Sequence, residues 1–317
     1  MRSFILIPNI VIEGANAISS PFTVGFPAMT AWLGSVHALQ RKLRKKGYED
    51  IVLDKCAVSC HAFDLHSYKD KGEFNSHLIG KRLPINKDGK LASFMVEGTC
   101  DLEVSLLIEY HNLNGEKVES FLEDINKIVQ FKMNMASGSV KSLNRVQFIH
   151  FDEDEDEEVQ LKPILRKLML GHVLIERRDL VEQNMNSGMD ALDAVLDPLK
   201  VVSQAMYVES KKEHEPQDKD HVEGNTHDES KEKARKVVWT YSTKQPGWIV
   251  PIAVGFKGIS PLGKAINQRD QNTEHRFAES VVTLGEFVMP FRIESLDQML
   301  WRYDIDQAND LYLCINN

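Results

Sequence analysis

The stretch NAISSPFTVGFPAMTAWLGSVHALQRKLRKK, residues 16–46, passes from a loop of small residues into a helical pattern with a basic end. The spacing predicts a helix over 28–46, and Pro27 suits its first turn. Cations at the C-terminal end oppose the helix dipole, so a solvated basic face is the alternative to a functional one. The apolar stripe of this helix repeats at steps of three and four residues: Met29, Trp32, Val36, Leu39 and Leu43.

Strand-like runs surround this helix on both sides. Residues 3–12 precede it, and residues 50–65 and 92–111 follow it as two further expected strands. Residues 116–134 repeat the helical spacing, and residues 144–151 alternate as a fourth strand. The resulting order is β-α-β-β-α-β, which is typical of a ferredoxin-like (RRM-like) core in an α+β fold.

The remaining chain divides by composition. We expect the core over residues 1–151, with a polar, basic insertion over 66–91 between its second and third strands. Residues 152–236 are expected to be a helical and mobile acidic or polar insertion, because residues 209–236 carry almost no apolar side chains. Residues 237–317 are expected to add a C-terminal β/α extension.

Finer expectations for the second half follow from local spacing. Residues 160–177 and 188–208 have helical spacing, and helices are also expected over 276–289 and 294–303. The runs VVWTYS, WIVPIAVGF and LYLCI have strand character.

Composition excludes several classes of protein. The 317 residues have a net charge of −9, which argues against a protein coated in nucleic acid but permits a local basic groove. No apolar run reaches the roughly 18 residues that cross a bilayer, and the first strand lacks a signal-peptide cleavage site, so we expect no membrane contact and a cytoplasmic protein. Cys56 and Cys60 would lie about 13 Å apart on a strand, so we expect buried thiols, no metal site and no cofactor.

The loop before the first helix is the first candidate site. Backbone N–H groups at a helix start suit an anion such as phosphate, and Ser19, Ser20 and Thr23 could add hydroxyl donors. Simple capping of the helix is the alternative. Phe22 and Phe26 could stack on bases, although packing of both into the core is the expectation.

Three other segments carry candidate chemistry. The insertion interleaves cations with Leu78, Ile79, Leu83 and Ile85, a pattern that suits a hairpin lying over single-stranded nucleic acid. The small-residue loops 136–139 and 258–261 permit close approach of a backbone, although ordinary turns would also explain them. The polar members of the insertion pattern are His77, Lys81, Arg82, Asn86, Lys87 and Lys90.

Asp152–Glu158, DEDEDEE, is a run of seven acidic residues. A solvated, self-repelling loop is the default interpretation of such a run. Binding of a basic partner is the alternative, which the sequence leaves open.

Several segments together resemble a known family. NAISSPFTVGFPAMTAWLGSVHALQR, LEVSLL, QPGWIVPIAVGF, ISPL and RFAESVVTLGEF are similar to the second subunit of the type I-F CRISPR surveillance complex, the Csy complex. The resemblance covers both ends of the chain and most of its middle, and it is weakest over residues 152–236.

The resemblance implies a non-catalytic RNA-binding subunit whose thumb is the 66–91 insertion. Such a subunit pairs with the large subunit as a heterodimer and holds the 5′ handle of the guide RNA. Repeating backbone subunits stack from there, and target DNA is contacted at most indirectly. The implied RNA-binding residues are Asn16, Ser19, Ser20, Thr23, Phe26, His77, Lys81, Arg82, Asn86, Ser137, Gly138, Ser139, Lys257, Gly258 and Ser260.

Two alternatives remain open from the sequence. Related ferredoxin-like proteins cut repeat RNA with a histidine, and His37 lies one helical turn from Arg41, so it could act as a general acid or base. A structural adaptor that makes no RNA contact is the other alternative.

Overall fold

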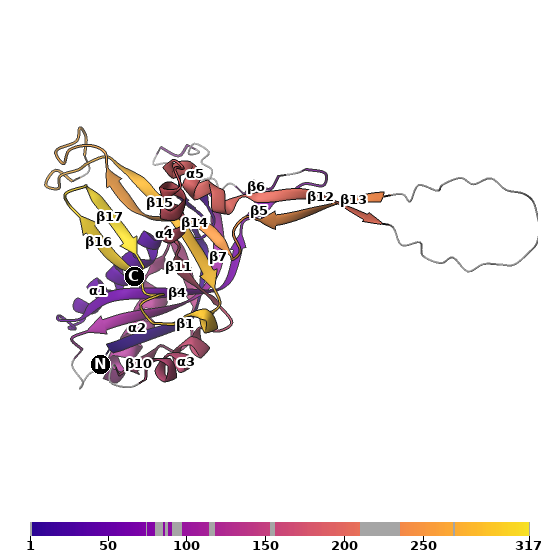
Figure 1. The fold of residues 1–317 in the computed structure, drawn as a ribbon. Coiled ribbons are helices and arrows are strands. Elements are labelled where there is room, and N and C mark those ends of the chain that lie inside the picture. The colour runs from indigo at the N-terminus through magenta and orange to yellow at the C-terminus, as the bar shows by residue number, and fades with distance from the viewer. Residues whose placement is uncertain are drawn as a thin grey trace, which may run out of the picture.

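The computed structural model describes residues 2–73, 75–79, 85, 88–90, 97–113, 118–152, 156–209, 235–268 and 270–316. Within these residues the chain is a strand-rich α+β protein (Figure 1). Its helices are α1 (Met29–Arg44), α2 (Val118–Lys132), α3 (Glu157–Leu168), α4 (Arg178–Asn186), α5 (Ala191–Leu196), and the 3-10 turns η2 (Asp197–Leu199) and η3 (Pro290–Arg292). Its strands are β1 (Arg2–Asn16), β2 (Ile18–Ser20), β3 (Thr23–Val24), β4 (Val52–Leu65), β5 (Ser67–Tyr68), β6 (His77–Leu78), β7 (Thr99–His111), β8 (Asn134–Met135), β9 (Gly138–Ser142), β10 (Gln147–Phe151), β11 (His172–Glu176), β12 (Val201–Glu209), β13 (Arg235–Thr243), β14 (Ile249–Gly258), β15 (Ala278–Val288), β16 (Arg302–Asp306) and β17 (Leu311–Ile315).

One curled sheet organises the protein. Its strand order is β16-β17-β14-β15-β11-β4-β7-β1-β9-β8, and β10 also pairs with β1. All of these pairings are antiparallel. Helix α1 contacts β8 near one end of this sheet and β14 and β17 near the other, so the sheet curls around α1.

Strand β1 separates two hydrophobic cores because its side chains alternate in direction. Ile5 and Ile7 belong to a core that includes α1 and α2, whereas Phe4 and Leu6 belong to a second core with α3. A bulge after Ile7 contains Pro8 and Asn9, with Asn9 at φ 49°. The extra residue shifts the alternation, so Ile10 and Ile12 face the same core as Ile5 and Ile7.

The expected first half of the fold matches the structure closely. β1, α1, β4, β7, α2 and β10 fall within or beside the six ranges that the sequence predicts. Four of the strands pair in the order β4-β7-β1-β10. The hairpin of β8 and β9 is an addition that the sequence pattern did not indicate.

The expected helix over 276–289 is wrong, and those over 160–177 and 188–208 are right only in part, where α3 and α5 form. Residues 172–176 form β11, where Val173 and Leu174 are fully buried between the two cores. Residues 201–209 form β12, which pairs only with β13 in a ribbon that projects from the body (Figure 1). Residues 278–288 form β15, whose Val281-Val282-Thr283 run favours a strand. A strand buried on both faces loses its period-2 signal, which explains the error at β11.

The fourth expected helix, over 294–303, is wrong as well. The described chain forms bends and turns there before β16 begins. The sequence correctly predicts the strand character of β13, β14 and β17.

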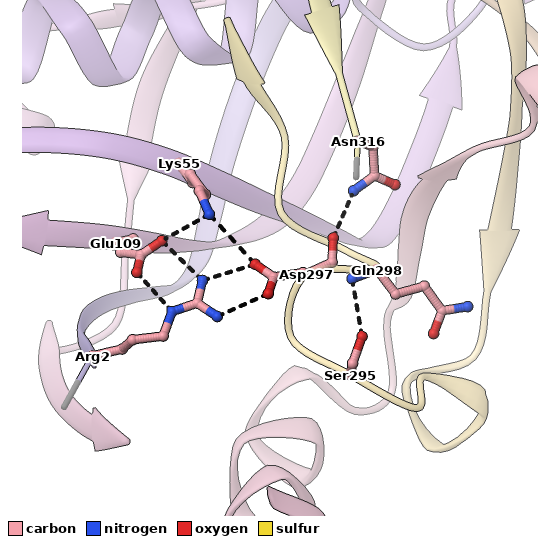
Figure 2. A network of polar contacts seen from close by, with 7 residues as sticks. All are labelled: Arg2, Lys55, Glu109, Ser295, Asp297, Gln298 and Asn316. Atoms are coloured by element: carbon pink, nitrogen blue, oxygen red, sulfur yellow. Dashed lines mark hydrogen bonds and ion pairs between the residues drawn. The ribbon is translucent and has the colours of Figure 1, made fainter. Parts of the chain in front are cut away.

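An ion cluster around the buried carboxylate of Glu109 joins the first strand to the C-terminal segment (Figure 2). Glu109 on β7 is 3% exposed, and it accepts two hydrogen bonds from Arg2, at 2.7 Å from Nε and 3.0 Å from Nη2. Arg2 also donates to both carboxylate oxygens of Asp297, at 3.0 and 3.2 Å. Lys55 Nζ lies 3.4 Å from Asp297 and 3.8 Å from Glu109, so two cations balance two carboxylates.

All four cysteines are free and buried, as the sequence predicts. Burial raises the pKa of the Cys60 thiol to about 12 and raises the pKa of Cys56 further still. These thiols therefore stay protonated at neutral pH and serve as core side chains.

Candidate nucleic-acid interface

Two predicted segments that lie far apart in the sequence meet at the end of β1. The backbone N–H of Asn16 donates to the carbonyl of Ala136 at 2.8 Å, and the N–H of Ala17 donates to the carbonyl of Gly98 at 3.0 Å. The loop that begins at Asn16 therefore lies beside the β8–β9 turn. The Asn16 side chain closes a local turn by accepting from the N–H of Ile18 at 3.1 Å and donating to its carbonyl at 2.9 Å.

The β8–β9 turn has an unusual backbone. Ala136 and Ser137 both adopt left-handed conformations, with φ of 47° and 68°, as a two-residue hairpin loop requires. Gly138 follows, and a Cβ there would lie 2.5 Å from Ile12 Cγ2 and 2.8 Å from the backbone N of Ala15. This glycine therefore allows the turn to lie directly against β1, with Ser137 and Ser139 exposed on its outer side.

The predicted hydroxyl donors form a cluster of their own. Thr23 Oγ1 lies 2.8 Å from both Ser19 Oγ and Ser20 Oγ, and Ser20 Oγ accepts from the N–H of Phe22 at 3.1 Å. Ser20 and Thr23 are buried. In this structure these hydroxyls stabilise the β2–β3 hairpin, and their contact with RNA stays a prediction.

The two phenylalanines of the loop have different surroundings. Phe26 packs on Trp32 with ring centroids 5.5 Å apart and meets the edge of Phe287 at 5.2 Å, so its expected core packing is confirmed. Phe22 is 86% exposed at the tip of the β2–β3 hairpin, so its expected burial is wrong. Phe22 lies in the turn of the hairpin, whereas Phe26 follows the hairpin and leads into α1, and composition carries no such signal.

The start of the insertion also reaches this region. The N–H of Ile79 donates to the carbonyl of His66, whose own N–H donates to Thr99, each at 2.9 Å. Leu78 packs beside Gly98 and Ile18. His77 bonds Glu73 at 2.7 Å and lies against the ring of Tyr68. Lys81, Arg82 and Asn86 lie outside the described residues, so their predicted role stays a prediction.

The two ends of α1 differ in their electrostatics. Its N-terminus has no side-chain cap and no acidic residue in its first turn, which leaves the positive dipole end without a carboxylate. The cations lie at the other end, about 24 Å away at 1.5 Å per residue over 16 residues. Arg41, Lys42 and Lys45 there line a shallow hollow of about 230 Å³, whereas Arg44 donates to the carbonyl of Ile51.

Lys257, Gly258 and Ser260 lie at the outer end of β14. The N–H of Gly258 donates to the carbonyl of Asp310 at 2.9 Å, and Ser260 Oγ accepts from the N–H of Phe277 at 2.8 Å. These bonds place the three residues among the C-terminal strands. They are connected to the Asn16 loop through β14, which contacts β2 and β3.

Three further features of the described part of the chain concern metal ligands, membrane-spanning helices and the position of His37. No group of three or more His, Cys, Asp or Glu side chains there could hold a metal ion. No described helix is long and apolar enough to cross a membrane. His37 is exposed on α1, and no hydrogen bond within the described residues orients its ring.

Comparison with known proteins gives a consistent result. Residues 5–314 match the family model described as CRISPR-associated protein (Cas_Csy2). The chain is 31% identical over 333 aligned positions to "CRISPR-associated protein Csy2" of Pseudomonas aeruginosa strain UCBPP-PA14. That alignment covers 98% of this chain and 94% of the relative.

Proposed function

The chain belongs to the Cas_Csy2 family of CRISPR-associated proteins, and we propose that it is a non-catalytic, cytoplasmic subunit of a type I-F CRISPR surveillance (Csy) complex. In that role it binds the 5′ handle of the guide RNA together with the large subunit and caps the filament of repeating backbone subunits. The antiparallel order β4-β7-β1-β10, with α1 and α2 on one face, supports a ferredoxin-like core for this function.

One observation carries the proposal. The Asn16–Phe26 loop and the Ser137–Ser139 turn, about 120 residues apart in sequence, are hydrogen-bonded neighbours at the end of β1. The two segments carry exposed side chains, namely Ser137 and Ser139 in the turn and the ring of Phe22 on the β2–β3 hairpin. Hydroxyl donors position a phosphate chain, and an aromatic face stacks on an unpaired base.

The endoribonuclease alternative is not favoured. The family match concerns a CRISPR-associated protein of the Csy2 type, and His37 has no hydrogen-bonding partner among the described residues to set its tautomer. Clean cutting of repeat RNA by the purified chain, lost in His37→Ala, would restore this alternative.

Ultraviolet crosslinking of the assembled complex tests the proposed function. The complex is prepared from all subunits with guide RNA, irradiated, and digested, and the crosslinked peptides are identified by mass spectrometry. We expect handle nucleotides on peptides from residues 16–26 and 136–139. Crosslinks confined to the side of the acidic run, or no crosslink to this chain, would contradict handle binding.

Phe22→Ala is expected to weaken handle binding because it removes an exposed stacking surface. Loss of one base–aromatic stack costs about 1–3 kcal/mol, which corresponds to a roughly 5- to 150-fold higher Kd. Fluorescence anisotropy with a labelled handle RNA measures the change in the chain bound to its large-subunit partner. Phe131→Ala, which removes a ring that is 74% exposed on α2, is the matched control and should leave Kd unchanged.

A further inference from the structure

An apolar groove lies between α3 and η3, on the face of the sheet opposite α1. The groove has a volume of about 780 Å³. Its floor includes the buried side chains of Leu161, Leu165 and Ile293, and Phe291 stands at its edge with 65% of its surface exposed. Met169, 37% exposed, lines it as well. Exposed apolar surface of this kind marks a site of interaction.

The rim of this α3–η3 groove is acidic. Asp156, Glu157, Glu158 and Glu294 line it, against the cations Lys162 and Arg166. Lys162 is already paired with Glu158 at 2.8 Å. The same acidic run continues upstream in the sequence through residues 152–155. The excess negative charge repels the phosphates of a nucleic acid and attracts lysine and arginine side chains.

The position of the groove separates it from the candidate RNA interface. The groove floor belongs to the core that includes Phe4 and Leu6, near the first residue of β1. The Asn16 loop lies at the other end of the same strand, about 40 Å from Phe4 as measured along the strand at about 3.3 Å per residue. Figure 1 shows α3 at one end of the body and α5 at the opposite end.

We propose that the α3–η3 groove binds a basic amphipathic helix of another protein subunit. The apolar face of such a helix covers the groove floor, and its lysines or arginines meet the acidic rim. Among the described residues, only α3, η3 and their flanking residues line the groove, so no strand lines it. The proposal rests on the proposed function in one respect: the helix belongs to a neighbouring subunit of the same complex.

Site-specific photocrosslinking identifies the occupant. The photoreactive residue p-benzoylphenylalanine replaces Phe291 in the chain co-expressed with all other subunits and guide RNA. The matched control places it at Phe131, which is similarly exposed on α2. We expect position 291, and not 131, to crosslink to a peptide of another subunit with net positive charge and apolar residues at helical spacing. Crosslinks to RNA, to a second copy of this chain, to this chain's own segments or to an acidic peptide would overturn the proposal, as would a yield no higher than at 131.

A charge placed in the groove gives an independent test. Because the side chain at position 291 is mostly exposed, the Phe291→Asp variant should fold, and its unfolding midpoint in urea should match that of the unaltered chain. We expect this variant to lower recovery of the crosslinked subunit about tenfold in pull-downs, with Phe131→Asp unchanged. Handle RNA binding by the variant chain should persist, which separates failure of the groove from failure of the proposed function. Full recovery of the partner with Phe291→Asp would contradict the proposal.

Discussion

Arg2→Ala is expected to lower the free energy of unfolding by about 3–5 kcal/mol, because it removes one partner of a buried ion pair. The Glu109 carboxylate is 3% exposed and takes both of its close hydrogen bonds in this cluster from Arg2. Lys55, 3.8 Å away, cannot replace that bidentate contact. Urea denaturation of the purified chain, followed by circular dichroism, measures the change.

Two further variants separate burial from charge in this prediction. Lys127→Ala removes a cation from an exposed pair with Glu123 on α2, and it should change stability by less than about 0.5 kcal/mol. Glu109→Gln in the Arg2→Ala background should recover part of the loss, since it removes the unpaired charge. A loss below about 1 kcal/mol for Arg2→Ala alone would show that the Glu109 carboxylate is not buried in solution.

The same cluster predicts how the stability of the protein changes as the pH falls. Burial raises the pKa of Asp297, but the hydrogen bond from Arg2 and the charges of Arg2 and Lys55 outweigh it and hold that pKa below its usual value. The contribution of Asp297 to stability is therefore present above its unfolded pKa of about 3.9 and is lost as pH falls through the folded value. Arg2→Ala should flatten this part of the stability curve.

Gly138→Ala is expected to destabilise the fold by about 1–3 kcal/mol and to weaken handle binding in the same variant. The added Cβ meets the backbone N of Ala15 at 2.8 Å and the carbonyl oxygen of Glu13 at 2.9 Å, and backbone atoms cannot move aside as a flexible side chain can. The β8–β9 turn must therefore shift away from Asn16. Urea denaturation and fluorescence anisotropy with handle RNA measure the two effects.

Gly34→Ala is the matched control because it makes the same change in open space. No atom lies within 4 Å of the Cβ that it would add on α1. Alanine is the better helix former, so this variant should gain about 0.5–1 kcal/mol and keep its RNA affinity. Equal behaviour of the two variants would mean that the contact between the turn and β1 does not hold the interface together.

The sequence predicts the elements that bury only one of their faces. The stripe from Met29 to Leu43 packs on one core, so its period is clear and α1 was correctly placed. The sequence does not predict β11 as a strand, because its buried run carries no alternation that distinguishes it from a helix. Pairing of β11 with β4 is a long-range contact that no local pattern encodes.

The candidate site divides in a similar way. Small residues and glycines identified the Asn16 loop and the turn at Gly138, because left-handed backbone and close approach favour such residues. The exposure of Phe22 and the distance of the α1 cations from the loop depend on three-dimensional placement. The same holds for the acidic run, whose apolar neighbour η3 lies more than 130 residues further along the chain.

The curl of the sheet around α1 has a consequence for synthesis of the chain. One flank of α1 contacts β14, which is translated about 200 residues after the helix itself. Translation proceeds at about 5–20 residues per second, so part of the apolar stripe of α1 stays exposed for roughly 10–40 s before β14 has been synthesised. The nascent chain therefore passes through a stage at which chaperone binding competes with aggregation, and shortening the C-terminal end would make that stage permanent.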